Sequence, residues 1–146
     1  MNLRKSTKLI NLYPPYLGAG ISIKEINENY TSITVQMKMH FWNRNLVGTH
    51  FGGSLYSMCD PFYMFILMEH LGKGYIVWDK AASIEFKKPG LKAVYATFSI
   101  SEAEIQQIKE KVDIEGKGNF TFYTEVVNDA NETIAKVEKV VYVRIK

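Results

Sequence analysis

The sequence is poor in cysteine, in histidine and in clusters of basic residues. Cys59 is the one cysteine among 146 residues, so no disulfide can form within the chain, and a reducing compartment is expected. No basic run exceeds the pair Lys87-Lys88, and the formal net charge is only +3, which argues against a nucleic-acid-binding surface. Three scattered histidines and one cysteine also lack the spacing of metal ligands, so we expect no metal site.

Long apolar runs are absent as well. The longest, from Phe62 to Met68, is much shorter than the roughly 20 residues that a membrane-spanning helix needs. The first ten residues show no apolar core of a signal peptide, and we expect a cytoplasmic protein. Hydrophobic residues make up 47% of the chain, which is enough for a packed core. We therefore expect one domain over residues 1–146, with residues 1–17 as an N-terminal helix or extension.

Much of the chain alternates apolar and polar residues, as half-buried strands do. Such alternation occupies residues 21–26, 31–39, 75–86, 91–101, 119–129 and 133–145. Tight turns between neighbouring segments indicate antiparallel pairing. Residues 101–113 have helical spacing instead: Ile105, Ile108 and Val112 fall on one face, and Ser101 and Glu104 can form a capping box.

The stretch VGTHFGGSLYSMCDPFYMFILMEHLG, residues 47–72, is nearly all apolar, yet it carries Asp60 at its middle, directly before Pro61. A helix over residues 52–71 would be about 30 Å long, enough to cross a sheet of five or six strands at about 4.8 Å per strand. One sheet can cover only part of a helix that is apolar on nearly every side. We therefore expect a second copy of the chain to cover more of it.

Two motifs carry a resemblance to a known family. The string N-L-V-G-T-H-F-G-G-S-L-Y-S-M-C-D, residues 45–60, resembles the signature N-x-x-G-x-x-H-G-G-x-L-x-x-x-x-D of hotdog-fold thioesterases of the phenylacetate-pathway type. IEFKKPG, residues 84–90, is similar to the strand-end pattern F-x-R/K-P-G of the same family. The chain looks most similar to a largely uncharacterised thioesterase-like branch. The resemblance implies an α+β hotdog fold, in which a curved antiparallel sheet of five to six strands wraps around one long central helix.

The resemblance also implies an acyl-coenzyme A thioesterase. Thioester hydrolysis needs a carboxylate that activates water or attacks the carbonyl, and donors for the developing oxyanion. By resemblance Asp60 would be the carboxylate and the backbone N–H groups of Gly52 and Gly53 the donors, with Asn45 and His50 in the same motif. Eight residues of helix separate Gly52 from Asp60 by about 12 Å, so one chain cannot assemble the site. The site would combine Gly52 of one protomer with Asp60 of its partner.

Coenzyme A would enter as part of the substrate, and no separate cofactor is expected. Lys87 and Lys88, beside the turn at Pro89 and Gly90, could hold its phosphates, although a solvated strand end explains these lysines equally well. The expected partners are an acyl-coenzyme A or a similar thioester and the chain itself, as a homodimer or a homotetramer built from dimers.

One position departs from the signature. The histidine that the family places before the glycine pair is Phe51 here, and His50 stands one position earlier. In the family this histidine is thought to position the thioester carbonyl, and His50 can replace it only if the loop is rearranged. A non-catalytic acyl- or lipid-binding hotdog protein is therefore the alternative function.

Other interpretations of the motif residues also remain open. Asp60 and Pro61 suit a helix start, with the carboxylate as N-cap and the proline in the first turn. The glycine pair could be no more than a tight entry into the helix. Cys59, with His50 or His40 as base, could act as a nucleophile, but a single cysteine in an apolar helix is usually a packing residue.

Overall fold

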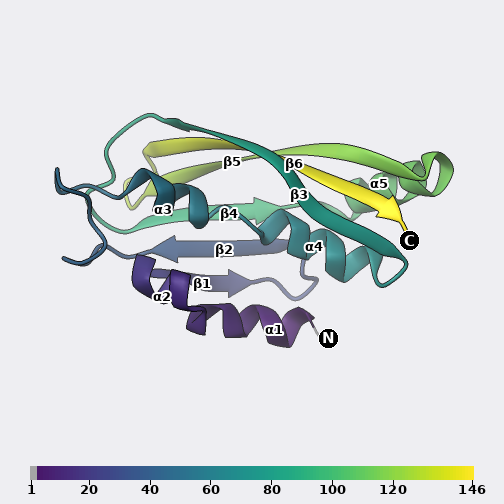
Figure 1. The fold of residues 1–146 in the computed structure, drawn as a ribbon, viewed down its shortest axis with the longest axis horizontal. Helices are drawn as coiled ribbons and strands as arrows, with labels where there is room; N and C mark the ends of the chain where they lie inside the picture. Colours follow the sequence, from purple (N-terminus) through teal and green to yellow (C-terminus); the bar gives the residue numbers. More distant parts are fainter. Residues whose placement is uncertain (1–2) are drawn as a thin grey trace.

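The computed structural model describes residues 3–146 and contains one six-stranded sheet (Figure 1). The strands are β1 (Ile21–Ile26), β2 (Ser32–Met37), β3 (Tyr75–Phe86), β4 (Val94–Ser99), β5 (Lys117–Asn128) and β6 (Thr133–Ile145). Their spatial order is β1-β2-β4-β5-β6-β3, and every pairing is antiparallel. The six alternating segments of the sequence therefore form the six strands, and the predicted α+β fold class is confirmed.

A helix between β4 and β5 forms as its sequence predicts. This helix, α5 (Glu102–Glu115), begins with a complete capping box: the Ser101 hydroxyl accepts from the backbone N–H of Glu104, whose carboxylate accepts from the N–H of Ser101. Its buried residues are Ile105, Ile108 and Val112. The capped first turn and one apolar face thus fix the position of α5 against the sheet.

The apolar stretch at the centre forms two helices, α3 (Gly52–Ser57) and α4 (Phe62–Leu71). The prediction of one continuous helix over residues 52–71 is wrong in this detail, because residues 58–61 form a turn. Pro61 has no N–H to donate to the carbonyl of Ser57. That carbonyl instead accepts from the Asp60 N–H at 3.3 Å and from the Tyr16 hydroxyl at 2.7 Å.

Asp60 does not cap the second helix either. Pro61 occupies the N-cap position of α4, and no side chain caps it. The alternative interpretation of Asp60 as an N-cap is therefore also wrong. Asp60 lies in a turn between two helices, where its carboxylate is not used by the backbone of α4.

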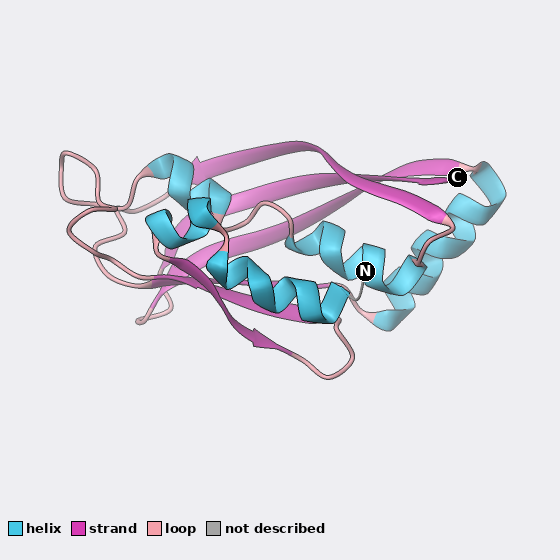
Figure 2. Cartoon of the chain, turned by 60° about the horizontal axis from the view of Figure 1, so that its bottom comes forward, coloured by secondary structure: helices cyan, strands magenta, loops and turns pink. Residues whose placement is uncertain are grey.

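The strands curve around α4 (Figure 2). Phe62, Ile66 and Leu67 have no exposed surface and belong to the core. By contrast, Met64 and Phe65 are only half-buried. The sheet therefore covers one side of α4, as expected for a helix that is apolar all round, and leaves the other side to different elements.

The N-terminal segment partly covers that other side of α4. It consists of α1 (Leu3–Leu9), the 3₁₀ helix η1 (Ile10–Leu12) and α2 (Pro14–Ala19), which lie beside β1 (Figure 1). An ion pair of 3.0 Å joins Arg4 of α1 to Glu69 of α4. Among residues 3–146, no helix is long and apolar enough to cross a membrane.

Candidate functional site

A fully buried lysine holds Asp60 in place. The side chain of Lys139, on β6, has no exposed surface, and its Nζ lies 3.2 Å from Oδ1 of Asp60 and 3.3 Å from Oδ1 of Asp79 on β3. The hydroxyl of Tyr56, on α3, donates to Oδ1 of Asp60 at 2.9 Å and accepts from Lys139 at 3.3 Å. One ammonium group therefore connects the turn after α3 with two neighbouring strands.

Lys139 and Asp79 were missed in the sequence, although β6 contains a signal. Lys139 is in phase with the buried residues Ala135, Val137, Val141 and Val143 of the alternating strand. A lysine at an inward-facing strand position must find anionic partners, because an unpaired buried charge is very costly. The sequence does not say which carboxylates these partners are, since they come from elements about 60 and 80 residues away.

Opposing effects act on the ionisation of this cluster. Burial lowers the pKa of Lys139, but the charges of Asp79 and Asp60 outweigh it, so that the pKa lies above its usual value. Burial raises the pKa of Asp79, and the ammonium of Lys139 opposes part of this effect. Lys139 is therefore charged at neutral pH and offsets part of the negative charge of the two carboxylates.

The cluster leaves Asp60 accessible. Its side chain remains 51% exposed, and its two hydrogen bonds within residues 3–146 both use Oδ1. The second oxygen makes no hydrogen bond within this part of the chain. The neighbouring Cys59 has no exposed surface, and burial raises the pKa of its thiol to about 12, which makes it a packing residue and not a nucleophile.

Most of the other predicted site residues line a separate cavity of about 360 Å³. The residues around this cavity are Asn45, Thr49, His50, Gly52, Leu55, Phe86, Lys87, Lys88, Pro89 and Gly90. The structure therefore brings the two sequence motifs together, although they are about 40 residues apart. Gly53 and Asp60 are not part of the lining, so in a single chain the carboxylate and the glycine cavity are separate.

Asn45 organises the loop that forms one wall of this cavity. Its Oδ1 accepts from the N–H groups of Val47 and Thr49 at 3.1 and 3.0 Å, and its Nδ2 donates to the Thr49 hydroxyl at 2.8 Å. Gly48 has a φ of +84°, a conformation that suits glycine in this turn. Every polar atom of the Asn45 side chain is thus used to shape the loop.

His50 forms a second part of the same wall. Its Nε2 donates to the carbonyl of Lys92 at 2.7 Å, and its backbone N–H donates to Gly90 at 2.9 Å. Burial lowers the pKa of His50, while the bond to Lys92 opposes this effect, so the ring is neutral at neutral pH. Its Nδ1 is buried without a partner among residues 3–146. His50 therefore braces the cavity and keeps one nitrogen as an unused acceptor.

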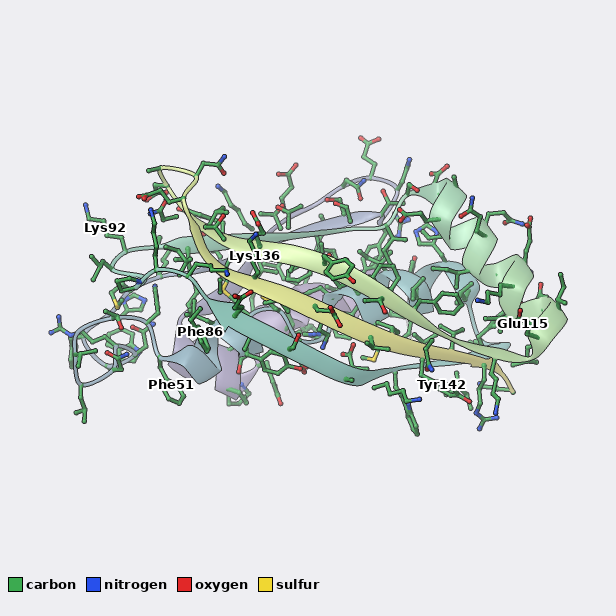
Figure 3. All side chains as sticks on the ribbon, turned by 90° about the horizontal axis from the view of Figure 1, so that it is seen from above. Phe51, Phe86, Lys92, Glu115, Lys136 and Tyr142 are labelled. Carbon is green, nitrogen blue, oxygen red and sulfur yellow. The ribbon has the colours of Figure 1, made fainter. Side chains whose placement is uncertain are left out.

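Aromatic rings lie against the glycine pair at the start of α3. A Cβ atom on Gly52 would lie 3.0 Å from Cζ of Phe86, and one on Gly53 would lie 2.7 Å from Cε1 of Phe51. Figure 3 shows Phe51 and Phe86 at the same end of the molecule, far from Glu115. The position of the family histidine is thus taken by a half-exposed ring that packs on Gly53. The N–H groups of Gly52 and Gly53, at the first positions of the helix, have no acceptor within it.

Lys87 and Lys88 follow β3 at the rim of this cavity. Each side chain is paired with a carboxylate, Lys87 with Glu85 and Lys88 with Glu132. These pairs lower the pKa of both glutamates. The lysine side chains are 38% and 57% exposed, so an anion from solvent would compete with the glutamates for them.

Several solved structures share this architecture. PA5026 of Pseudomonas aeruginosa, a protein of unknown function described as "Probable Thioesterase", has a TM-score of 0.86 at 12% identity, over 98% of this chain and 96% of that one. The PaaI protein of the phenylacetic acid degradation operon of Escherichia coli has a TM-score of 0.66 at 20% identity, over 99% and 96%. Thioesterase HI1161 of Haemophilus influenzae has a TM-score of 0.70 at 12% identity, over 97% and 90%. No curated protein sequence matches this chain.

These likenesses define the fold as that of the hotdog thioesterases, as the two motifs predicted. The family model of a domain of unknown function, DUF4442, matches residues 3–143. The chain belongs to the DUF4442 family.

The buried cluster leads to a prediction about stability. Lys139→Met leaves Asp60 and the mostly buried Asp79 without their cation, so we expect a loss of about 3–5 kcal/mol in the free energy of unfolding at pH 7. The loss should shrink as the pH falls, because protonation removes the unpaired negative charge and the pKa of Asp79 is already raised. Urea denaturation at pH 7 and pH 4.5 measures both effects.

A matched control for this experiment is Lys136→Met. Lys136 lies on the same strand, but its side chain is 55% exposed and 3.6 Å from Glu125, so we expect a change below about 1 kcal/mol. Equal effects of the two substitutions would show that burial of Lys139 does not matter.

Proposed function

We propose that this protein hydrolyses acyl-coenzyme A thioesters. Asp60 acts as the general base for water or as the nucleophile, and the N–H groups of Gly52 and Gly53 stabilise the oxyanion. The products are a carboxylic acid and coenzyme A. The proposal is supported by the motif residues and by the hotdog fold shared with thioesterases of low sequence identity.

The single observation that carries this proposal is the environment of Asp60. Lys139 and Tyr56 both fix Oδ1 of this carboxylate, although Asp79 already gives Lys139 an anionic partner. Its side chain is nevertheless half exposed. A carboxylate that is held rigidly at one oxygen and is open at the other is suited to act on a bound substrate.

The proposed site is shared between two protomers. Asp60 does not line the cavity at Gly52, and in this proposal a second chain supplies one of the two parts. The twelve-residue strand β3 forms a free edge of the sheet in a single chain and exposes Trp78 and Phe86. Unpaired edges of this length are normally covered, and we propose that β3 contributes to the dimer interface.

In this arrangement the cavity beside Lys87 and Lys88 receives the coenzyme A part of the substrate. The neutral ring of His50 and the loop held by Asn45 form its wall. The two lysines would exchange their glutamate partners for phosphate oxygens. Coenzyme A is thus a component of the substrate and not a resident cofactor.

A second candidate function is the binding of acyl groups without hydrolysis. The observation that favours it is the position of Phe51, whose ring packs on Gly53 where the family has a histidine. In this second function the ring would leave no room for a thioester carbonyl at the N–H of Gly53. An assay of hydrolysis and of binding on the same acyl-coenzyme A series separates the two functions, because only the first predicts release of free thiol.

Asp60→Asn tests the carboxylate directly. The change keeps the shape of the side chain but removes the base or nucleophile, so we expect turnover to fall by about 10²–10⁴-fold. Asp79 still balances Lys139 in this variant, and we expect a stability loss of only about 1 kcal/mol. Thiol release and thermal unfolding are the two measurements. Asp129→Asn, on a surface turn, should leave both unchanged; near-normal turnover in Asp60→Asn would rule out the mechanism.

Mixing two inactive variants tests whether the site is shared. Gly52→Pro removes one N–H donor, and proline suits the first position of a helix. The exposed ring of Phe86, 3.0 Å from a Cβ at this position, must shift to admit it. We expect Gly52→Pro and Asp60→Asn to be inactive separately. After the two are unfolded together and refolded, activity should return, because each mixed dimer contains one intact site. A site within one chain would give no recovery. Light scattering at micromolar concentration should show dimers, and monomers would contradict a shared site.

The lysine pair at the cavity rim gives a further test. In the double variant Lys87→Ala/Lys88→Ala, we expect the KM for acyl-coenzyme A to rise by about tenfold or more, since charged hydrogen bonds to phosphate are lost. Pantetheine thioesters of the same acyl group lack the nucleotide and should be almost unaffected. The matched control is Lys136→Ala, which changes an exposed lysine outside this cavity. An equal rise for both substrates would show that the lysines do not bind the nucleotide end.

A further inference from the structure

A larger cavity, of about 550 Å³, lies between the N-terminal helices and α4. Six of its lining residues define its character: Leu9, Leu12, Tyr13, Asp60, Met64 and Phe65. Its volume is within the range of about 300–1,000 Å³ that is typical of small-molecule sites. None of its lining residues belongs to the cavity beside Lys87 and Lys88.

The walls of this cavity are fixed to the rest of the molecule. The Tyr16 hydroxyl donates to the carbonyl of Ser57, directly beside the turn that holds Asp60. At the other end of the N-terminal segment, the hydroxyls of Thr7 and Tyr30 are hydrogen-bonded. The side chains that face α4 are therefore carried by a segment with defined contacts, even though Leu9 and Leu12 are themselves largely exposed.

The lining is mostly apolar, and its polar groups are the carboxylate of Asp60 and the hydroxyls of Ser6, Thr7, Tyr13 and Tyr16. Among residues 3–146, its lining contains no lysine or arginine, and Asp60 is the one charged residue. A phosphate or a free carboxylate would be repelled there. A neutral hydrocarbon group is favoured, because it would cover Met64 and Phe65, the half-buried residues of a helix whose other side is fully buried.

We propose that this cavity holds the acyl group of the substrate and that the segment formed by α1, η1 and α2 limits its length. The inference rests on the proposed function, because it places the thioester carbonyl at Asp60, which lines this cavity. The acyl group then occupies the N-terminal cavity of the protomer that supplies Asp60. The coenzyme A part extends to the lysine-rimmed cavity of the partner protomer, which supplies Gly52.

Non-hydrolysable S-alkyl-coenzyme A thioethers, from ethyl to dodecyl, test this assignment by calorimetric titration. Each added methylene that becomes buried should raise the affinity by up to about fourfold, until the chain fills the cavity and the affinity no longer rises. In Leu12→Trp, a larger side chain at an exposed position would occupy part of the cavity. The affinity of this variant for the thioethers should therefore stop rising at a shorter alkyl chain. Leu9→Trp is an independent variant with the same expectation.

Leu17→Trp is the matched control. Leu17 lies on α2 and is 54% exposed, compared with 68% for Leu12, but it does not line the cavity. Its chain-length profile should equal that of the wild type. An identical profile in Leu12→Trp, Leu9→Trp and Leu17→Trp would overturn the assignment.

Hydrolysis of the corresponding thioesters separates this inference from the proposed function. One outcome is binding whose affinity stops rising at a shorter alkyl chain in the two cavity variants, without thiol release from the thioesters. This outcome would support the acyl site and contradict the thioesterase. Hydrolysis with a chain-length preference that neither variant changes would support the thioesterase and overturn the acyl site.

Discussion

The buried ammonium group of Lys139 is the interaction on which the arrangement of the site depends. It has no contact with solvent, and two carboxylates and a phenol surround it. A buried charge is tolerated only when its partners are fixed at short distance. The turn after α3 and the strand β3 must therefore take up positions from which their carboxylates reach the ammonium group of Lys139 on β6. The pairing of β3 with β6 is irregular between Asp79 and Ala81, beside the carboxylate that Lys139 requires.

A second constraint comes from Pro61. It interrupts the central helix and frees a carbonyl, which the Tyr16 hydroxyl satisfies. Tyr16 is 5% exposed, and burial raises its pKa, so it stays protonated and remains a donor at neutral pH. The N-terminal segment is thus linked to the turn that carries Asp60. The carbonyl that Pro61 frees at the break in the helix is thus also a point at which α2 is attached.

The strands and α5 could be predicted because their signals are local: alternation defines the strands, and a capping box with one apolar face defines α5. Gly52, His50 and Lys87, which the resemblance assigns to the site, line one cavity, and their roles stay predictions. Pro61 was a local signal for the division of the central helix, but the donor that takes the freed carbonyl and holds the turn lies 41 residues away and has no local signal. The partners of Lys139 were missed for the same reason: no local pattern identifies which carboxylates reach a buried lysine.

The N-terminal helices differ from the sheet in the kind of contact that holds them. The sheet is held by continuous ladders, whereas α1 and α2 are anchored at separate points, Arg4, Thr7 and Tyr16. Leu9 and Leu12 lie between these anchors and contribute little buried area. Substitutions at these two positions therefore reshape the surface of the segment at small cost to folding. Related sequences can diverge in what this surface accepts while keeping the same sheet, turn and buried lysine.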